Sequence, residues 1–489
     1  METALLIALP LLSGLLTFLF QENKAKQISF LISIATFINA LYLAFNYCSC
    51  TLFNYDLNLN WINSLGIHFH VAVDGISLIL ILLTTLLVPL ILLSTFQSPI
   101  KNAKSFYFLI LAMESALIGV FTARDAFLFY IFWELALIPI YFICLIWGGE
   151  NKNKITFKFF LYTLAGSLFM LLAIIILYLN NPARTFEIEQ LYQVGRTLDF
   201  GTQAIIFWSL FLAFAIKMPI FPFHTWQPDT YTTAPFAGTM LLSGIMLKMG
   251  IYGVIRWLYP MVPLAFDFYA HYAIILSVIG IIYASIIALM QKNLKRMIAY
   301  VSIAHVGLIS AGVFVGNEEA LQGAIIQMFM HGINVVGLFF VIQLIFERTN
   351  ALDMTSLGGI RAKAPLFTLF FIIILLSSVA VPLTGGFVGE FLLFVGIFQY
   401  HEIIAAVSGL TIVFGAAYML NSFQKVMLGE ANEKTENFKP LHLTEKMLLI
   451  PIVALIIIIG VYPKPFLKIS EPAVKALIEI ANSTIPLNH

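Results

Sequence analysis

Lys217 is the residue whose chemistry stands out first, because it lies in an apolar stretch that reads Phe-Ala-Ile-Lys-Met-Pro-Ile-Phe-Pro. A cation near the bilayer centre costs about 2.5–3.5 kcal/mol on insertion scales, so its presence in a membrane helix points to a function. Pro219 and Pro222 follow within five residues, and each proline lacks an N–H and interrupts a helix. Interrupted backbone at membrane depth is packed in protein or lines a wet cavity. The lysine and the broken helix together predict an ion path.

Four further ionisable residues fall within apolar stretches, namely Glu114, Glu134, Lys248 and Glu390. Together with Lys217 they would cost about 12–17 kcal/mol to insert, which is comparable with the ~5–15 kcal/mol net stability of an ordinary protein. Pairing and hydration must offset most of this cost. Structural ion pairs are one explanation, but burying an ion pair often fails to stabilise a protein. We therefore favour proton handling for the group and leave Glu114 open between function and packing.

Glu134 is the natural counter-ion for Lys217. It lies about midway along the fifth apolar run, in the segment Tyr-Ile-Phe-Trp-Glu-Leu. The proton affinity of each of the two groups depends on how close the other lies, so the pair would form a switchable proton site. Lys248 is expected on the next helix, where it could receive or pass the same proton.

Two sets of polar residues recur at helical spacing later in the chain. Ser302 and His305 are three residues apart, and Gln327, His331 and Asn334 are separated by four and three, so each set lies on one helix face. Such stripes can serve as interhelical hydrogen-bond contacts alone. A histidine, whose unperturbed pKa is about 6.5, is also the side chain best suited to passing protons near neutral pH. Both histidines are therefore candidate relay residues.

The composition is that of an integral membrane protein. Of 489 residues, 61% are hydrophobic and 10% are charged, and the mean hydropathy is +0.95. Most apolar runs approach or exceed the roughly 20 residues that cross a ~30 Å hydrocarbon core, whereas a membrane β-barrel would alternate polar and apolar residues. A net charge of +1 gives no general attraction to nucleic acid. The three cysteines lack the spacing of zinc, haem or iron–sulfur ligands, so we expect no metal or cofactor in this chain.

Hydropathy and helix breakers predict an all-α membrane protein with about fourteen transmembrane helices. The seventh and twelfth helices are discontinuous, the seventh at Pro219 and Pro222 and the twelfth at Pro382 and Gly385-Gly386. Two broken helices at matching places are typical of an internally repeated transporter fold. The expected spans are residues 3–20, 28–46, 72–96, 105–122, 126–147, 156–180, 202–220, 235–258, 270–290, 297–315, 319–346, 366–398, 402–424 and 446–463.

The loops between these spans differ sharply in their basic residues. Seventeen Lys and Arg, including Lys292, Lys295 and Arg296, fall on one side and seven on the other. The Lys-rich side is expected to be cytoplasmic, with an even number of crossings and both termini outside. Residues 47–71, which contain no Lys or Arg, are expected to form a short external hairpin or loop. Residues 465–489 are too polar to span and are expected to form an interfacial helix.

Longer motifs around the polar residues resemble a known family, the antiporter-like membrane subunits of respiratory complex I, which are related to Mrp-type cation/proton antiporter subunits. The resemblance covers residues 70–460 and rests on Phe132-Trp-Glu-Leu-Ala-Leu-Ile-Pro-Ile-Tyr141, Lys217-Met-Pro-Ile-Phe-Pro-Phe-His-Thr-Trp-Gln-Pro-Asp229, Ser243-Gly-Ile-Met-Leu-Lys-Met-Gly250, Tyr300-Val-Ser-Ile-Ala-His-Val-Gly307 and Gly385-Gly-Phe-Val-Gly-Glu-Phe391. With glutamate at position 390, the chain resembles the M-type members, the homologues of mitochondrial subunit 4, because L-type, N-type and Mrp relatives are expected to carry lysine at this position. Many relatives have a histidine where Tyr231 follows Pro228-Asp229-Thr230 here, so a titratable role at that position is in doubt.

The resemblance implies two inverted five-helix repeats, formed by helices four to eight and nine to thirteen. The chain would then divide into residues 1–100, an N-terminal three-helix region with an external loop; 101–260, the first repeat; 265–428, the second repeat; and 429–489, a C-terminal helix with an interfacial tail. It also implies a polar axis for proton relay through Glu134, Lys217, Lys248, His305, His331 and Glu390.

The function implied by the resemblance is that of a proton-translocating membrane subunit of an NADH:quinone oxidoreductase. This chain would hold no redox centre, and FMN, iron–sulfur clusters and quinone would belong to partner subunits. The expected partners are neighbouring L-type and N-type antiporter-like subunits, the lipid bilayer and protons, with no nucleic acid. A bacterial inner membrane is favoured over an organellar one. Two alternatives stay open: an Mrp-type cation/proton antiporter subunit, and a purely structural membrane spacer.

Overall fold

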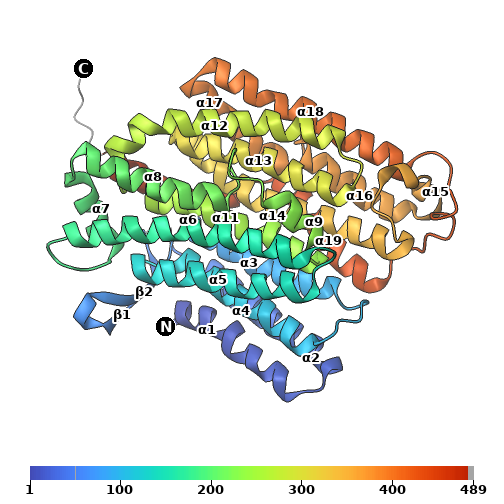
Figure 1. The fold of residues 1–489 in the computed structure, drawn as a ribbon, viewed down its shortest axis with the longest axis horizontal. Helices are drawn as coiled ribbons and strands as arrows, with labels where there is room; N and C mark the ends of the chain where they lie inside the picture. The colour runs from blue at the N-terminus through green and yellow to red at the C-terminus, as the bar shows by residue number, and fades with distance from the viewer. Residues whose placement is uncertain (50, 483–489) are drawn as a thin grey trace.

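Long helices that run roughly alongside one another make up most of the chain (Figure 1). The computed structural model describes residues 1–49 and 51–482. Within those residues, thirteen helical spans are long and apolar enough to cross a membrane. Two shorter apolar helices, α16 (Pro365–Ser378) and α17 (Gly385–Tyr400), follow one another across a break and together supply one more span. The predicted all-α fold with about fourteen spans and a broken twelfth helix is confirmed.

The spans divide between the two halves of the chain. Those of the first half are α1 (Glu2–Gly14) with η1 (Leu15–Leu19), α2 (Glu22–Phe45), α3 (Gly75–Ser94), α4 (Ala103–Thr122), α5 (Ala126–Trp147), α6 (Lys152–Asn180) and α8 (Phe200–Lys217). The eighth span joins α10 (Phe236–Leu241), η3 (Leu242–Met246), α11 (Leu247–Gly253) and η4 (Val254–Leu258). Those that follow, apart from the α16–α17 pair, are α12 (Pro263–Met290), α13 (Leu294–Val315), α14 (Glu318–Thr349), α18 (Glu402–Met427) and α19 (Leu443–Val461).

Short elements complete the two ends of the bundle. They are β1 (Asn54–Ile62), η2 (Asn63–Leu65), β2 (Ile67–Val73), α7 (Ile188–Thr197), α9 (Gln227–Thr233), η5 (Met354–Ser356), α15 (Ile360–Lys363) and α20 (Lys464–Asn482). Strands β1 and β2 pair antiparallel, with Leu59 opposite Phe69. A hairpin thus forms where residues 47–71 were expected to fold into a hairpin or loop, although β2 continues to Val73, and its external position stays a prediction. The hairpin and α7 lie at one end of the bundle and α15 lies at the other (Figure 1).

Polar residues begin several of the spans. Asp74 accepts a hydrogen bond from the backbone N–H of Ser77, whose hydroxyl oxygen accepts from the N–H of Asp74, so the two residues cap α3 reciprocally. This cap explains why α3 begins three residues later than the predicted start at 72. Asn293 and Asn317 accept from the N–H groups of Arg296 and Ala320 and so cap α13 and α14.

Helix α8 ends at Lys217, as the two prolines after it predict. Pro219 has no N–H to donate to the carbonyl of Ala215. That carbonyl accepts instead from the N–H of Ile220 at 2.9 Å. The carbonyl of Ile216 accepts from the indole N–H of Trp226 at 2.9 Å. The break is thus satisfied within the protein, as backbone at membrane depth requires.

The break between α16 and α17 lies at residues 379–384, just ahead of the predicted Gly385-Gly386 pair. Ala380 and Leu383 have positive φ angles there, +54° and +72°, which is uncommon for residues with a side chain. Gly386 opens α17 against the end of α16, because a Cβ at this position would lie 2.0 Å from the carbonyl oxygen of Ser377. The close approach requires glycine.

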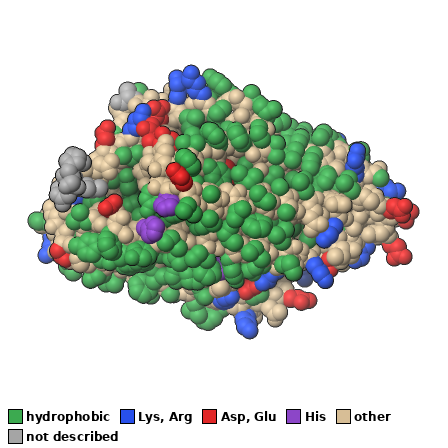
Figure 2. Space-filling model, turned by 90° about the horizontal axis from the view of Figure 1, so that it is seen from above, with side chains coloured by type: hydrophobic (Ala, Val, Ile, Leu, Met, Phe, Trp, Pro, Cys, Tyr) green, Lys and Arg blue, Asp and Glu red, His purple; other side chains and the backbone are tan. Residues whose placement is uncertain are grey.

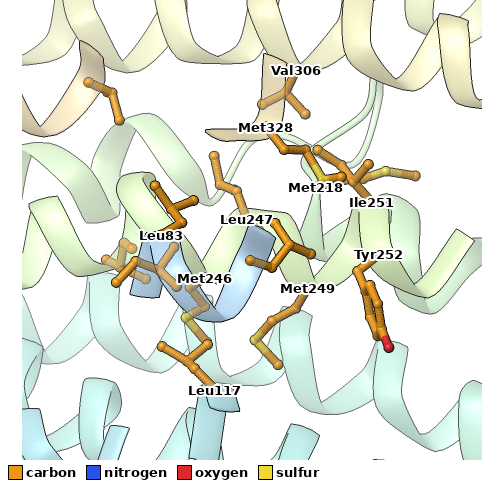
Figure 3. Close-up of a cluster of buried hydrophobic side chains, with 14 of the residues drawn as sticks. Leu83, Leu117, Met218, Met246, Leu247, Met249, Ile251, Tyr252, Val306 and Met328 are labelled. Carbon is orange, nitrogen blue, oxygen red and sulfur yellow. The ribbon is translucent and has the colours of Figure 1, made fainter. Parts of the chain in front are cut away.

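Hydrophobic side chains cover much of the long outer face of the bundle (Figure 2), as expected for a surface that meets lipid. Another hydrophobic cluster fills the interior around the eighth span (Figure 3). Met246, Leu247 and Met249 of that span pack there with Leu83 of α3 and Met328 of α14. The residues next to Lys248 in sequence therefore lie in dry packing.

Helix α20 accounts for most of the tail that was predicted to be an interfacial helix. Its residue Ser470 donates a hydrogen bond to Gln322 near the start of α14. The start of α3 also lies against it, since a Cβ on Gly75 would meet the carbonyl oxygen of Ile469. Helix α20 therefore packs across the ends of two spans. The last part of the predicted tail, 483–489, lies outside the described residues.

Candidate functional site

Lys217 is buried at the last position of α8, beside the broken backbone. Its Nζ lies 5.4 Å from the centroid of the Trp133 ring of α5, which is cation–π distance. Within the part of the chain that the structure describes, Nζ has no hydrogen-bond partner. A lysine ammonium has three N–H donors, so a protonated Lys217 would have hydrogen bonds left to make in this conformation.

Glu134 lies on α5 next to Trp133 and is half-buried. Its carboxylate interacts electrostatically with Lys217 and lies beside Ser167 of α6. Its Oε1 has no hydrogen-bond partner among the described residues, so the expected counter-ion is near Lys217 without a direct hydrogen bond to it. The predicted pair is thus an open arrangement in this conformation.

Lys248 lies in the eighth span directly after the π-helical turn η3, and its side chain is fully buried. Its Nζ donates to the carbonyl of Ser243 at 2.6 Å and lies 2.9 Å from Nδ1 of His331 on α14. π-helical turns inside longer helices are frequent at functional sites. The turn and the contact with His331 make Lys248 one end of a hydrogen-bonded cluster.

His331 connects Lys248 to α13. Its Nε2 lies 3.1 Å from the hydroxyl oxygen of Ser302, and its ring centroid is 6.0 Å from that of His305. Both histidines and Ser302 border a small cavity with room for about one water molecule. Nε2 of His305 has no hydrogen-bond partner within the described chain. A water in this cavity would bridge the two rings.

Glu390 completes the cluster on α17. Its Oε1 lies 3.0 Å from Nδ1 of His305 and accepts from the amide of Gln327 at 3.2 Å. Tyr418 of α18 is buried nearby and interacts with the same carboxylate. The second broken helix therefore holds its carboxylate against α13 and α14.

The structure brings four of the six predicted residues, Lys248, His331, His305 and Glu390, into one cluster. Glu134 and Lys217 form a separate neighbouring pair. No hydrogen bond joins Lys217 to Lys248 in the described chain, although a Cβ on Gly250 would lie 2.9 Å from the backbone nitrogen of Met218. The order of the cluster differs from a simple passage from Lys248 to His305, because His331 lies between them.

Lys295 does not lie where the sequence predicted, and Glu114 was left open between function and packing. Lys295 was grouped with a cytoplasmic loop, but its side chain is only 3% exposed, because α13 begins before it and packs against α9. Glu114 is fully buried on α4, and neither of its carboxyl oxygens has a hydrogen-bond partner in the described part of the molecule. No cluster of three or more potential metal ligands occurs among the residues described.

The sequence profile of the NADH:quinone oxidoreductase/Mrp antiporter transmembrane family matches residues 123–415. The chain belongs to this family. The matched region contains all six candidate relay residues, the break after α8 and the break before α17. The predicted family resemblance is confirmed.

Relatives within this family resemble nearly the whole chain. NADH-quinone oxidoreductase subunit M of Rickettsia prowazekii (strain Madrid E) is 39% identical over 480 residues, covering 96% of this chain and 97% of that protein. A chain of respiratory complex I from Thermus thermophilus with bound NADH superimposes with a TM-score of 0.91 at 28% identity, covering 99% of this chain and all of that one. A chain of the Mrp complex from Dietzia sp. DQ12-45-1b shares the fold with a TM-score of 0.86 at 19% identity, over 98% of this chain and 52% of that one.

Proposed function

We propose that this chain is the M-type proton-translocating membrane subunit of an NADH:quinone oxidoreductase. The observation that carries the proposal is the buried cluster Lys248–His331–His305–Glu390. Hydrogen-bond distances join Lys248 to His331 and His305 to Glu390, and both histidines border one water-sized cavity. The similarity to NADH-quinone oxidoreductase subunit M over 96% of the chain supports the same assignment. The chain would act as part of a translocase whose electron transfer takes place elsewhere.

Proton transfer would begin at Lys248. A protonated Nζ donates to Nδ1 of His331 at 2.9 Å, so His331 must be neutral and carry its own hydrogen on Nε2. Transfer of the Lys248 proton to Nδ1 produces an imidazolium, which then releases the Nε2 proton toward Ser302 or a water in the adjoining cavity. His305 takes up that proton and passes it from Nδ1 to the carboxylate of Glu390.

The pair of Glu134 and Lys217 would control loading of the cluster. A positive charge on Lys217 disfavours a second positive charge on the neighbouring Lys248, and approach of the Glu134 carboxylate cancels part of that effect. A charge change in an adjoining subunit that moves Glu134 toward Lys217 would thus alter the proton affinity of Lys248. This provides electrostatic coupling without a redox centre in the chain.

The assembly follows from this assignment. FMN, iron–sulfur clusters and quinone would be held by partner subunits, and the membrane neighbours would be L-type and N-type antiporter-like subunits. The protein would lie in a bacterial inner membrane with both termini outside, because the Lys-rich loops mark the cytoplasmic side.

Two substitutions test the proposed function in the intact complex. Complexes with Lys217→Ala or Glu134→Ala should assemble and yet lose most NADH-driven proton pumping, measured by dye quenching in inverted membrane vesicles. Assembled complexes that pump at near-normal rates would contradict the proton-relay assignment. A purely structural spacer predicts that Lys217→Met leaves the pumping stoichiometry unchanged.

An Mrp-type cation/proton antiporter subunit is the second candidate, and the shared fold with a chain of the Mrp complex favours it. Purification of the native complex separates the two candidates. Flavin and iron–sulfur subunits that co-purify with this chain support the oxidoreductase, whereas an exchanger would be isolated without them.

A further inference from the structure

Lys295 is a buried cation that the proposed relay leaves without a function. Its Nζ donates to the carbonyl of Ala234 at 2.6 Å and lies 4.3 Å from the centroid of the Phe236 ring. The carboxylate of Asp229 on α9 does not pair with Lys295 among the described residues; it pairs with Lys158 at 3.2 Å and with Arg296 at 3.1 Å. A lysine buried against one carbonyl and one aromatic face carries an insertion cost that a structural ion pair does not offset here.

Lys295 lies on the same face of α13 as the proton-relay cluster. It precedes Ser302 by seven residues, which is two helical turns and about 10 Å at 1.5 Å per residue. Ile298 lies between them on that face and lines the small cavity that borders Ser302, His305 and His331. The Ile298 side chain therefore separates Lys295 from this cavity, which has room for about one water molecule.

A larger hollow lies on the other side of Lys295. It has a volume of about 560 Å³, and Pro235, Phe236 and Glu347 are among the residues that line it. Glu347 accepts hydrogen bonds from Ser98 at 2.9 Å and from Gln343 at 2.8 Å, so the hollow contains a carboxylate held by polar groups. The ring of Phe236 borders this hollow and also contacts Lys295. Lys295 is thus separated from the hollow by one aromatic side chain.

We propose that Lys295 is the proton-loading residue on the Lys-rich side of the relay. The amine form of Lys295 accepts a proton at Nζ from water in the hollow when the Phe236 ring moves aside. The ammonium then gives one N–H proton, past the Ile298 side chain, to water in the cavity beside Ser302, which restores the amine and delivers the proton toward Nε2 of His305. This inference rests on the proposed relay and adds a second point of entry to it besides Lys248.

Arginine separates this role from simple anchoring of the joint between α9 and α10. Arginine keeps the positive charge and can donate to the carbonyl of Ala234, but it does not release a proton in proteins. Lys295→Arg and Lys295→Met would be compared in the intact complex, with Lys292→Met as the control, because Lys292 is exposed just before α13 begins. Assembly would be followed on native gels and pumping in inverted vesicles.

We expect assembled Lys295→Arg and Lys295→Met complexes to pump at least about tenfold more slowly than the wild type, since a positioned proton-transfer group typically contributes about 10²–10⁴-fold, and Lys292→Met to pump normally. Normal pumping by Lys295→Arg would overturn the proposal, because it would show that only the charge matters. If the Lys295 variants fail to assemble, Ile298→Phe tests the same route by enlarging the side chain between Lys295 and the cavity beside Ser302. Normal pumping by an assembled Ile298→Phe complex would likewise overturn it.

A His331→Gln complex measured in parallel separates the two levels of the account. If His331→Gln stops pumping while Lys295→Arg pumps normally, the relay stands and the loading role of Lys295 fails. If both variants pump normally, the proposed relay itself fails.

Discussion

Nζ of Lys248 lies 2.9 Å from Nδ1 of His331, although the two residues lie on different helices and are 83 residues apart in sequence. An ammonium at Lys248 can only donate, so Nδ1 of the ring accepts in that state. The proposed relay therefore takes His331 as its first acceptor, with Ser302 and His305 after it.

Replacement of His331 by glutamine tests this order. Glutamine retains one hydrogen-bond acceptor and one donor group but cannot carry a proton between them, so the complex should assemble and pump at least about tenfold more slowly. Proton translocation in inverted vesicles measures the effect. Asn334→Ala is the control, since Asn334 lines the same cavity without titrating, and equal losses in both variants would indicate a packing defect instead.

Glu390 is expected to need its charge and not only its hydrogen bonds. In Glu390→Gln the side-chain oxygen can still accept from His305 and Gln327, but the proton acceptor at the end of the cluster is lost. We expect normal assembly with strongly reduced pumping, whereas Glu402→Gln on the exposed first turn of α18 should be silent. A Glu390→Gln complex that pumps like the wild type would remove Glu390 from the path.

The start of α17 should not tolerate a side chain at position 386. A Cβ on Gly386 would lie 2.0 Å from the carbonyl oxygen of Ser377, so Gly386→Ala must separate α16 from α17, at a cost of about 1–3 kcal/mol for overpacking. The thermal unfolding midpoint of the purified complex should fall. Gly409→Ala is the matched control, because its Cβ meets no atom within 4 Å, and a similar fall in both variants would refute the explanation.

The β1–β2 hairpin should be held in a pH-dependent way by His70 of β2 and Glu187 before α7, which are in direct contact. Burial lowers the pKa of His70, but the hydrogen bond and charge of Glu187 and the charge of Asp56 outweigh it, so the pKa is raised above 6.5. Burial raises the pKa of Glu187, but the hydrogen bonds and charges of His70 and His68 outweigh burial, so the pKa of Glu187 lies below 4.5. The pair therefore stabilises the hairpin fully between the ordinary pKa values of the two groups, 4.5 for Glu187 and 6.5 for His70. This stabilisation is lost as pH rises through the raised pKa of His70.

Hydrogen exchange of the β1–β2 amides measures this effect. After correction for intrinsic exchange rates, protection should fall as pH rises above about 6.5 and through the raised pKa of His70, where the histidine loses its proton. The fall should disappear in His70→Gln and persist in His271→Gln, a variant of an exposed histidine on α12. Protection that stays constant with pH in the wild type would contradict the role of His70.

Several features of the fold could be predicted from sequence because their causes are local. Pro219 and Pro222 end α8 at Lys217 through the chemistry of proline itself. Long apolar runs indicate spans by their length alone, and the stretch between the second and third spans, without Lys or Arg, indicated the hairpin. Individual buried charges such as Lys217 and Glu390 could also be identified, because an ionisable side chain within an apolar run is costly to insert in a membrane.

The contacts between helices could not be predicted in this way. Lys248 pairs with His331 from another helix and follows the π-helical turn η3, for which the sequence gives no recognised signal. Lys295 lies in a basic segment that hydropathy assigns to a loop, and only the packing of Phe236 and Ala234 against it shows its burial. The short amphipathic helix α7 was missed because it is too short and too polar to register as a span. The division into two inverted repeats stays a prediction.

The central claim is tested most directly by NADH-driven proton uptake into proteoliposomes that contain the purified complex with Lys248→Met. Methionine fills a volume similar to that of the lysine stem but carries no exchangeable proton, so packing in the cluster around the eighth span is preserved. The account predicts an assembled complex with its flavin and iron–sulfur subunits present and with proton uptake reduced at least about tenfold. An assembled Lys248→Met complex that takes up protons at the wild-type rate would contradict it.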